Sequence, residues 1–75
     1  MNMLINMLKR SAEADKAKAL LSLDLLGNKA TGIGDHSTGD FYKNAEEALS
    51  LLVDADDRLN TLSKYFSTPK QQLNE

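Results

Sequence analysis

The most regular hydrophobic pattern of the chain runs through its second half. Eight apolar residues follow one another there at alternating steps of four and three, and we call them the Phe41 seam: Phe41, Ala45, Ala48, Leu52, Ala55, Leu59, Leu62 and Phe66. A seam with this spacing lies along one face of an α-helix and is typical of left-handed packing against a neighbouring helix. Three of the eight residues are Ala, which allows that neighbour to approach closely. The pattern predicts a helix over about residues 38–66.

The first half of the chain has a less regular pattern. Residues 2–26 contain no Gly or Pro and are rich in strong helix formers. One strip of polar residues at steps of three and four is expected to face solvent: Asn2, Asn6, Lys9, Glu13 and Lys16. The rest of the circumference is mostly apolar, which is typical of a helix with neighbours on more than one side. The sequence predicts a helix over about residues 2–26, with Gly27 and Asn28 as its stop.

These two segments define the expected architecture. At 1.5 Å per residue the helices would be about 37 and 43 Å long, similar enough to lie side by side. A Gly-rich loop over residues 27–37 would join them, and Ser37 and Asp40 resemble a capping box at the start of the second helix. We therefore predict an all-α fold, with a helical hairpin over residues 1–66 and a flexible C-terminal tail over residues 67–75.

The small size of the chain points to self-association. A single core in a chain of about 75 residues rarely provides much stability, and with no Cys there is no disulfide to reinforce it. Another copy of the chain, or a different partner, would then supply the missing burial. We predict a homodimer that forms a four-helix bundle. The candidate core and interface residues are Leu20, Leu23, Leu26, Phe41, Ala45, Ala48, Leu49, Leu52, Ala55, Leu59, Leu62 and Phe66.

Charge and composition narrow the function classes. Nine basic and 11 acidic residues give a net charge of −2, without the basic stripe that phosphate binding requires. A nucleic-acid-binding regulator remains an alternative that would use the basic residues Lys9, Arg10, Lys16 and Lys18. No apolar run approaches the ~20 residues that span a bilayer, so we expect no membrane insertion. The absence of Cys fits the reducing cytoplasm, which is the expected location.

One segment carries chemically versatile side chains. The loop from Asp35 to Thr38 combines an acid, a base and two hydroxyls between glycines, so a ligand-binding or catalytic module is a second alternative. Its spacing matches neither the dinucleotide fingerprint nor the P-loop. Turn chemistry explains the composition better, and a lone His without Cys makes no zinc site. We expect no enzyme, no catalytic residue, no metal site and no cofactor.

A resemblance adds context. Residues 32–66, with the sequence GIGDHSTGDFYKNAEEALSLLVDADDRLNTLSKYF, resemble small accessory proteins encoded by tailed phages of marine cyanobacteria. The similarity extends to the segment MLKRSAEADKAKALLSLDLL in the first half of the chain. It implies an accessory protein made in the cytoplasm of the infected host, and it carries no functional residue to this chain. Together with the residue patterns, it favours a non-enzymatic interaction protein that binds a host or phage protein.

Overall fold

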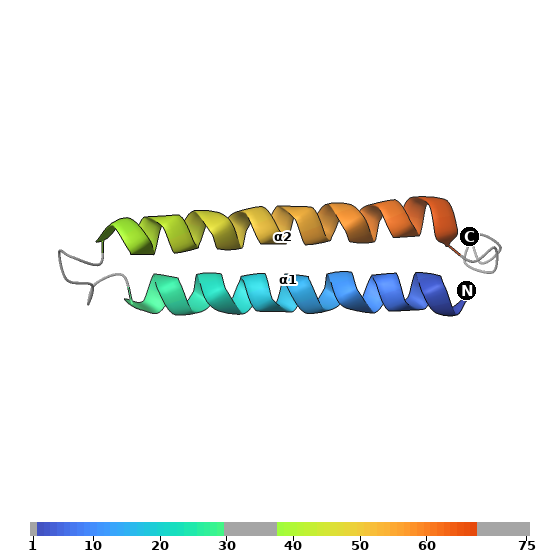
Figure 1. The fold of residues 1–75 in the computed structure, drawn as a ribbon, viewed down its shortest axis with the longest axis horizontal. Helices are drawn as coiled ribbons and strands as arrows, with labels where there is room; N and C mark the ends of the chain where they lie inside the picture. The colour runs from blue at the N-terminus through green and yellow to red at the C-terminus, as the bar shows by residue number, and fades with distance from the viewer. Residues whose placement is uncertain (1, 30–37, 68–75) are drawn as a thin grey trace.

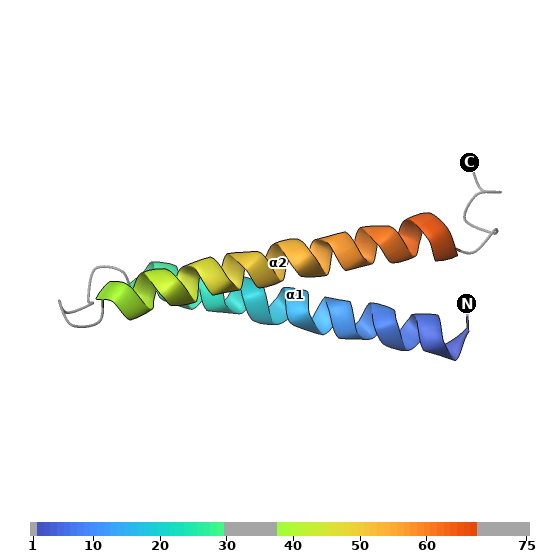
Figure 2. The ribbon, with the colours of Figure 1, turned by 45° about the horizontal axis from the view of Figure 1, so that its top comes forward.

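The computed structural model describes residues 2–29 and 38–67, which form two long antiparallel helices (Figure 1). Helix α1 spans Met3–Lys29 and helix α2 spans Thr38–Phe66, with 27 and 29 residues. They lie side by side and cross at a shallow angle (Figure 2). The described residues contain no strand. The predicted all-α hairpin is therefore confirmed.

The start of α1 is fixed by a side-chain cap. The backbone N–H of Ile5 donates a hydrogen bond of 2.8 Å to Oδ1 of Asn2, and the N–H of Asn6 donates one of 3.1 Å to the Asn2 carbonyl. Asn is among the residues that best satisfy the free N–H groups of a first helical turn. Asn2 is thus the N-cap of α1, a role that its place in the expected solvated strip did not suggest.

The end of α1 differs from the sequence prediction. The helix continues through Gly27 and Asn28 to Lys29, so the connection begins later than residue 27. A Gly stop works when the Gly takes a positive φ, and Gly27 does not adopt one. A single Gly inside a helix costs only about 1 kcal/mol, which is not enough to end it.

Helix α2 has the bounds expected from its pattern, and its end at Phe66 is confirmed. Asp40 lies in its first turn and Lys64 in its last, where each charge complements the helix dipole. The hydroxyl of Ser67 donates a hydrogen bond to the carbonyl of Ser63 just beyond the last turn. The proposed cap Ser37 and the tail from residue 68 onward lie outside the described residues.

The line of contact between the helices consists mainly of alanines. Five apolar residues are buried: Ile5, Ala12, Ala19, Ala48 and Ala55. The three from α1 are spaced by seven residues, so they form one line that faces α2. No large side chain among the described residues is completely buried. Small residues on both sides allow the helices to approach closely.

The Phe41 seam faces α1 along most of its length. Ala48 and Ala55 are buried, and the other members are half-buried up to Leu62. Phe66 is the exception, because 49% of its surface is exposed. It lies at the end of α2, where α1 has just begun and offers little surface to cover it.

Candidate interaction surfaces

Two ion pairs connect the helices. Lys16 Nζ lies 3.1 Å from Asp56 Oδ1, and Arg58 Nη2 donates a 2.7 Å hydrogen bond to Asp15 Oδ2. Asp15 and Lys16 are consecutive residues of α1 and lie on either side of the line through the buried Ala12 and Ala19. The two ion pairs therefore lie on opposite broad faces of the hairpin. We call these the Lys16 face and the Asp15 face.

The Lys16 pair also corrects an expectation. Lys16 was expected to belong to a fully solvated strip, yet its side chain is 42% exposed and contacts α2. The strip runs along the edge of the helix contact instead of opposite it. The reason is that the small residues of α1, and not its leucines, pack against α2.

The Asp15 face carries a network of four charged residues. Arg58 Nε is 3.0 Å from Asp54 Oδ2, although its N–H does not point at that oxygen, and Lys18 Nζ is 3.8 Å from Asp15 Oδ1. The hydrogen bond from Arg58 holds the pKa of Asp15 below its ordinary value of 3.8. The same bond raises the pKa of Arg58. Asp15 and Arg58 thus both remain charged at neutral pH.

The Lys16 face carries a cluster of large apolar side chains toward the loop end. Leu20 lies one helical turn beyond Lys16, and Leu49 lies seven residues before Asp56, so both share this face. They are 48% and 54% exposed. Tyr42, two turns from Leu49 on the same side, is 60% exposed. This surface has no covering element in the described part of the chain.

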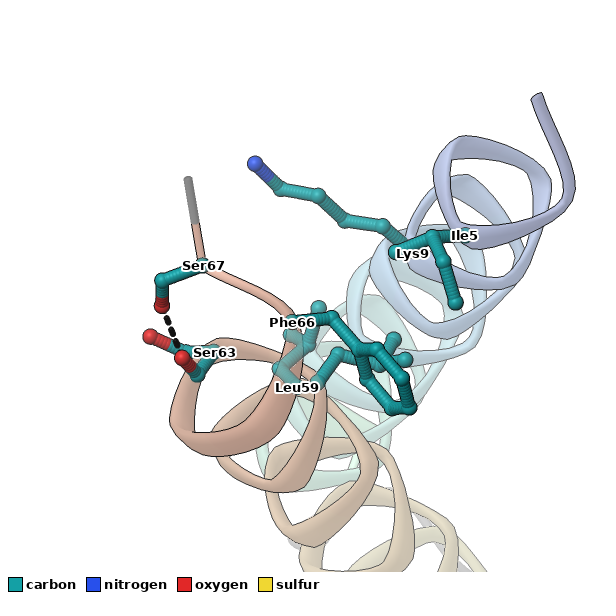
Figure 3. A pocket seen from close by; sticks show the side chains of 7 residues that line it. Ile5, Lys9, Leu59, Ser63, Phe66 and Ser67 are labelled. Atoms are coloured by element: carbon teal, nitrogen blue, oxygen red, sulfur yellow. Dashed lines mark hydrogen bonds between the residues drawn. The ribbon is translucent and has the colours of Figure 1, made fainter. Parts of the chain in front are cut away.

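At its other end the Lys16 face holds a small hollow between the helices. Its lining includes Ile5 and Lys9 from α1 and Leu59, Ser63 and Phe66 from α2. Figure 3 shows the Phe66 ring turned toward α1 while the Lys9 chain extends outward. The volume is about 70 Å³, whereas small-molecule sites usually measure about 300–1,000 Å³. This hollow is better described as the end of an incomplete helix contact than as a ligand site.

On the Asp15 face, α1 contributes three exposed leucines. Leu4, Leu8 and Leu25 are 59%, 40% and 47% exposed. Leu8 borders an open groove of about 290 Å³, whose other walls include Arg58 and Thr61. On the α2 side, the half-buried Leu51 and the exposed Tyr65 lie seven residues before and after Arg58, so this side is mixed in polarity.

The predicted site residues fall into three groups. Two are buried in the contact between the two helices: Ala48 and Ala55. Three are exposed by about half: Leu20, Leu49 and Phe66. Seven are half-buried: Leu23, Leu26, Phe41, Ala45, Leu52, Leu59 and Leu62. Residues 35–37 of the versatile loop lie outside the described residues, and Thr38 begins α2.

The basic residues of the nucleic-acid alternative are mostly engaged by carboxylates. Arg10 pairs with Glu13 at 3.5 Å, and Lys16 and Lys18 make the ion pairs described above. A groove for phosphates would need these charges free and gathered on one surface. They are instead distributed around α1.

Comparisons with known proteins do not extend this picture. Neither protein-family models, nor curated proteins, nor solved structures give a match to the chain. Within residues 2–29 and 38–67, neither helix is long and apolar enough to cross a membrane. The same ranges contain no group of three or more His, Cys, Asp or Glu side chains arranged to hold a metal ion.

Proposed function

We propose that this chain is a non-enzymatic interaction protein that acts as a helical homodimer, with two hairpins forming a four-helix bundle. The observation that carries the proposal is the distribution of apolar side chains. The hairpin buries mainly alanines, whereas 12 large apolar residues of the described ranges remain at least 40% exposed. Such surface on a small protein is typical of an interface.

The energetics of burial support the same reading. Hydrophobic stabilisation scales with apolar area removed from water, and an Ala contributes far less area than a Leu or Phe. The contact between α1 and α2 therefore leaves most of the available stabilisation unused. A second copy is the simplest source of the missing contacts, because two-fold dimers are the commonest soluble oligomers.

A dimer that uses one broad face leaves the other open to a different protein. The resemblance to accessory proteins of marine cyanophages supports the cytoplasm of an infected host as the setting. We propose that the free face binds a host or phage protein there. The exposed Leu4, Leu8 and Leu25 of the Asp15 face are suited to such a contact.

Sedimentation equilibrium of the full chain at micromolar concentration tests the dimer. The expected mass is twice the 8.3 kDa of one chain. Circular dichroism over a dilution series should show helix loss on dilution, because folding and association would share one equilibrium. A stable monomer with undiminished helix on dilution would contradict the proposal.

A further inference from the structure

Helix α2 carries a second regular seam beside the one that faces α1. Its members, which we call the Tyr42 strip, are Tyr42, Ala45, Leu49, Leu52, Asp56, Leu59, Ser63 and Phe66. They are spaced 3, 4, 3, 4, 3, 4 and 3, which keeps them on one side of a helix in a two-stranded packing. Half of them also belong to the Phe41 seam. The strip therefore flanks the contact with α1, on the side of the Lys16–Asp56 pair, and it lies on the Lys16 face.

Exposure along the strip shows that α1 does not cover it. Tyr42, Leu49 and Phe66 are 60%, 54% and 49% exposed, and Leu52 and Leu59 are half-buried at the edge of the helix contact. The ring of Phe41 meets that of Tyr42 edge-on at 5.5 Å between centroids, so Tyr42 is supported from within the hairpin. A helix with two adjacent seams is what a four-helix bundle requires of each member.

Outside its two central members, the order of residues along the strip matches itself when read backwards. If a second α2 runs antiparallel, with its axis of symmetry level with residue 54, Tyr42 lies opposite Phe66 of the second copy. Leu49 then lies opposite Leu59, and the small Ala45 opposite the small Ser63. Aromatic meets aromatic, small meets small and Leu meets Leu. The central pair differs, because Leu52 lies opposite Asp56 of the second copy, which keeps its own Lys16 partner. This is the self-complementarity that an isologous two-fold interface needs.

The charges on the strip also favour the antiparallel arrangement. Asp56, the one charged member, is paired with Lys16 at 3.1 Å. Around the two-fold axis, two Lys16–Asp56 pairs would lie about 6 Å apart along the helices, which gives a centre with no net charge. A parallel arrangement would set Asp56 directly against its own copy, which is unfavourable.

The available area is close to that of a specific dimer. Residues 42–66 span about 36 Å, and two packed helices are about 18–20 Å wide, so the Lys16 face offers roughly 700 Å². This area includes the polar strip of α1 with Lys9, Glu13 and Lys16. A standard interface buries about 800 Å² on each partner. The Asp15 face is less suitable for self-association, because Asp54 and Arg58 occupy the α2 side at its middle.

We propose that the Tyr42 strip is the dimer surface, with two copies of α2 packed antiparallel across a two-fold axis. This assignment rests on the proposed homodimer and names the residues that form it. Leu20 and Leu23, on the same face, lie at the edge of the α2–α2 contact and extend it.

Disulfide cross-linking tests this assignment without interference from native thiols, because the chain contains no Cys. In the double variant Ala45→Cys/Ser63→Cys, the two thiols lie about 27 Å apart along one helix, so neither can bridge to the other within a chain. In the proposed dimer the thiol at position 45 faces the thiol at position 63 of the other copy, within the distance that a disulfide bridges. Mild oxidation should give a covalent dimer on a denaturing gel. The matched control is Glu47→Cys/Thr61→Cys, which has the same symmetric register on the Asp15 face and should run as a single chain on the same denaturing gel.

The outcomes separate this assignment from the dimer itself. Rapid cross-linking of the 45/63 variant but not of the 47/61 control supports the Tyr42 strip. The unmodified chain could sediment as a dimer while only the 47/61 variant cross-links, or while neither variant does. Either result would show that the Tyr42 strip is not the dimer surface, although the homodimer itself would stand. If the unmodified chain sediments as a monomer and neither variant cross-links, both proposals fail.

Discussion

The two helices of this hairpin contribute to their contact in different ways. Helix α2 presents a seam that combines Ala with the larger Phe and Leu. Helix α1 presents Ile5, Ala12 and Ala19, flanked by the charged Asp15 and Lys16, while most of its large apolar residues remain exposed. The most hydrophobic side of α1 is therefore not the side that packs against α2.

This difference shows what selects a packing face. Close approach of two helices requires small residues at the contact line and compatible charges beside it. Ala12 and Ala19 meet the first condition, and Asp15 and Lys16 meet the second because Arg58 and Asp56 stand opposite them. Hydrophobicity alone predicts which residues are buried. It does not predict which helix or which second chain covers them.

Truncation of a large α2 residue should have the largest effect on stability. Leu59 belongs to both seams of α2, so Leu59→Ala should lower the free energy of unfolding by about 2–5 kcal/mol if the bundle forms. Urea denaturation followed by circular dichroism, at two protein concentrations tenfold apart, measures this and shows whether the midpoint depends on concentration. The control Leu21→Ala removes a 59% exposed side chain and should change the value by less than about 0.5 kcal/mol. Equal losses in the two variants would show that α2 has no special role.

Enlargement of a small α1 residue should have the next largest effect. Ala19 is completely buried, so Ala19→Leu should push the helices apart and cost about 1–3 kcal/mol. Ala17, two residues earlier, is exposed, and Ala17→Leu should be close to neutral. The same denaturation experiment compares them. If Ala19→Leu stabilised the protein, the close contact between the helices would be wrong.

The sequence was informative where a regular local pattern governs the outcome. The bounds of α2 and the orientation of Ala48 and Ala55 follow from steps of three and four, which the structure confirms. The end of α1 was missed because the stop at Gly27 depends on a positive φ that this residue does not take. The packing face of α1 was missed because the Lys16–Asp56 and Asp15–Arg58 pairs join residues some 40 positions apart, and sequence periodicity cannot align two helices. One usable signal for this face was the seven-residue spacing of Ile5, Ala12 and Ala19, which places the three residues on one line along α1.

Removal of the α1 cap should have a smaller effect. Asn2→Ala removes the oxygen that accepts the Ile5 N–H and should cost about 1 kcal/mol. The control Asn6→Ala changes an exposed Asn one turn into the helix and should cost less. Amide hydrogen exchange at Ile5 is the direct measurement, because its protection should fall in the first variant only. Unchanged protection in Asn2→Ala would show that the start of α1 is held by another contact.

The smallest effect on stability is expected from the ion pair on the Asp15 face, because exposed pairs contribute little. The ion pair is instead detected through the titration of Asp15. The hydrogen bond from Arg58 lowers the pKa of Asp15 in the folded protein relative to 3.8, so this pair stabilises the fold above that pH and the contribution is lost as the pH falls through the folded pKa. NMR titration of the Asp15 carboxyl carbon should give a value below 3.8 in the unmodified chain. In Arg58→Gln it should move up toward the ordinary value, whereas Arg10→Gln, which removes a cation that pairs with Glu13, should leave it unchanged. An Asp15 pKa that does not respond to Arg58→Gln would mean that the two side chains do not meet in solution, and the alignment of α1 with α2 would then rest on the Lys16–Asp56 pair and the alanines alone.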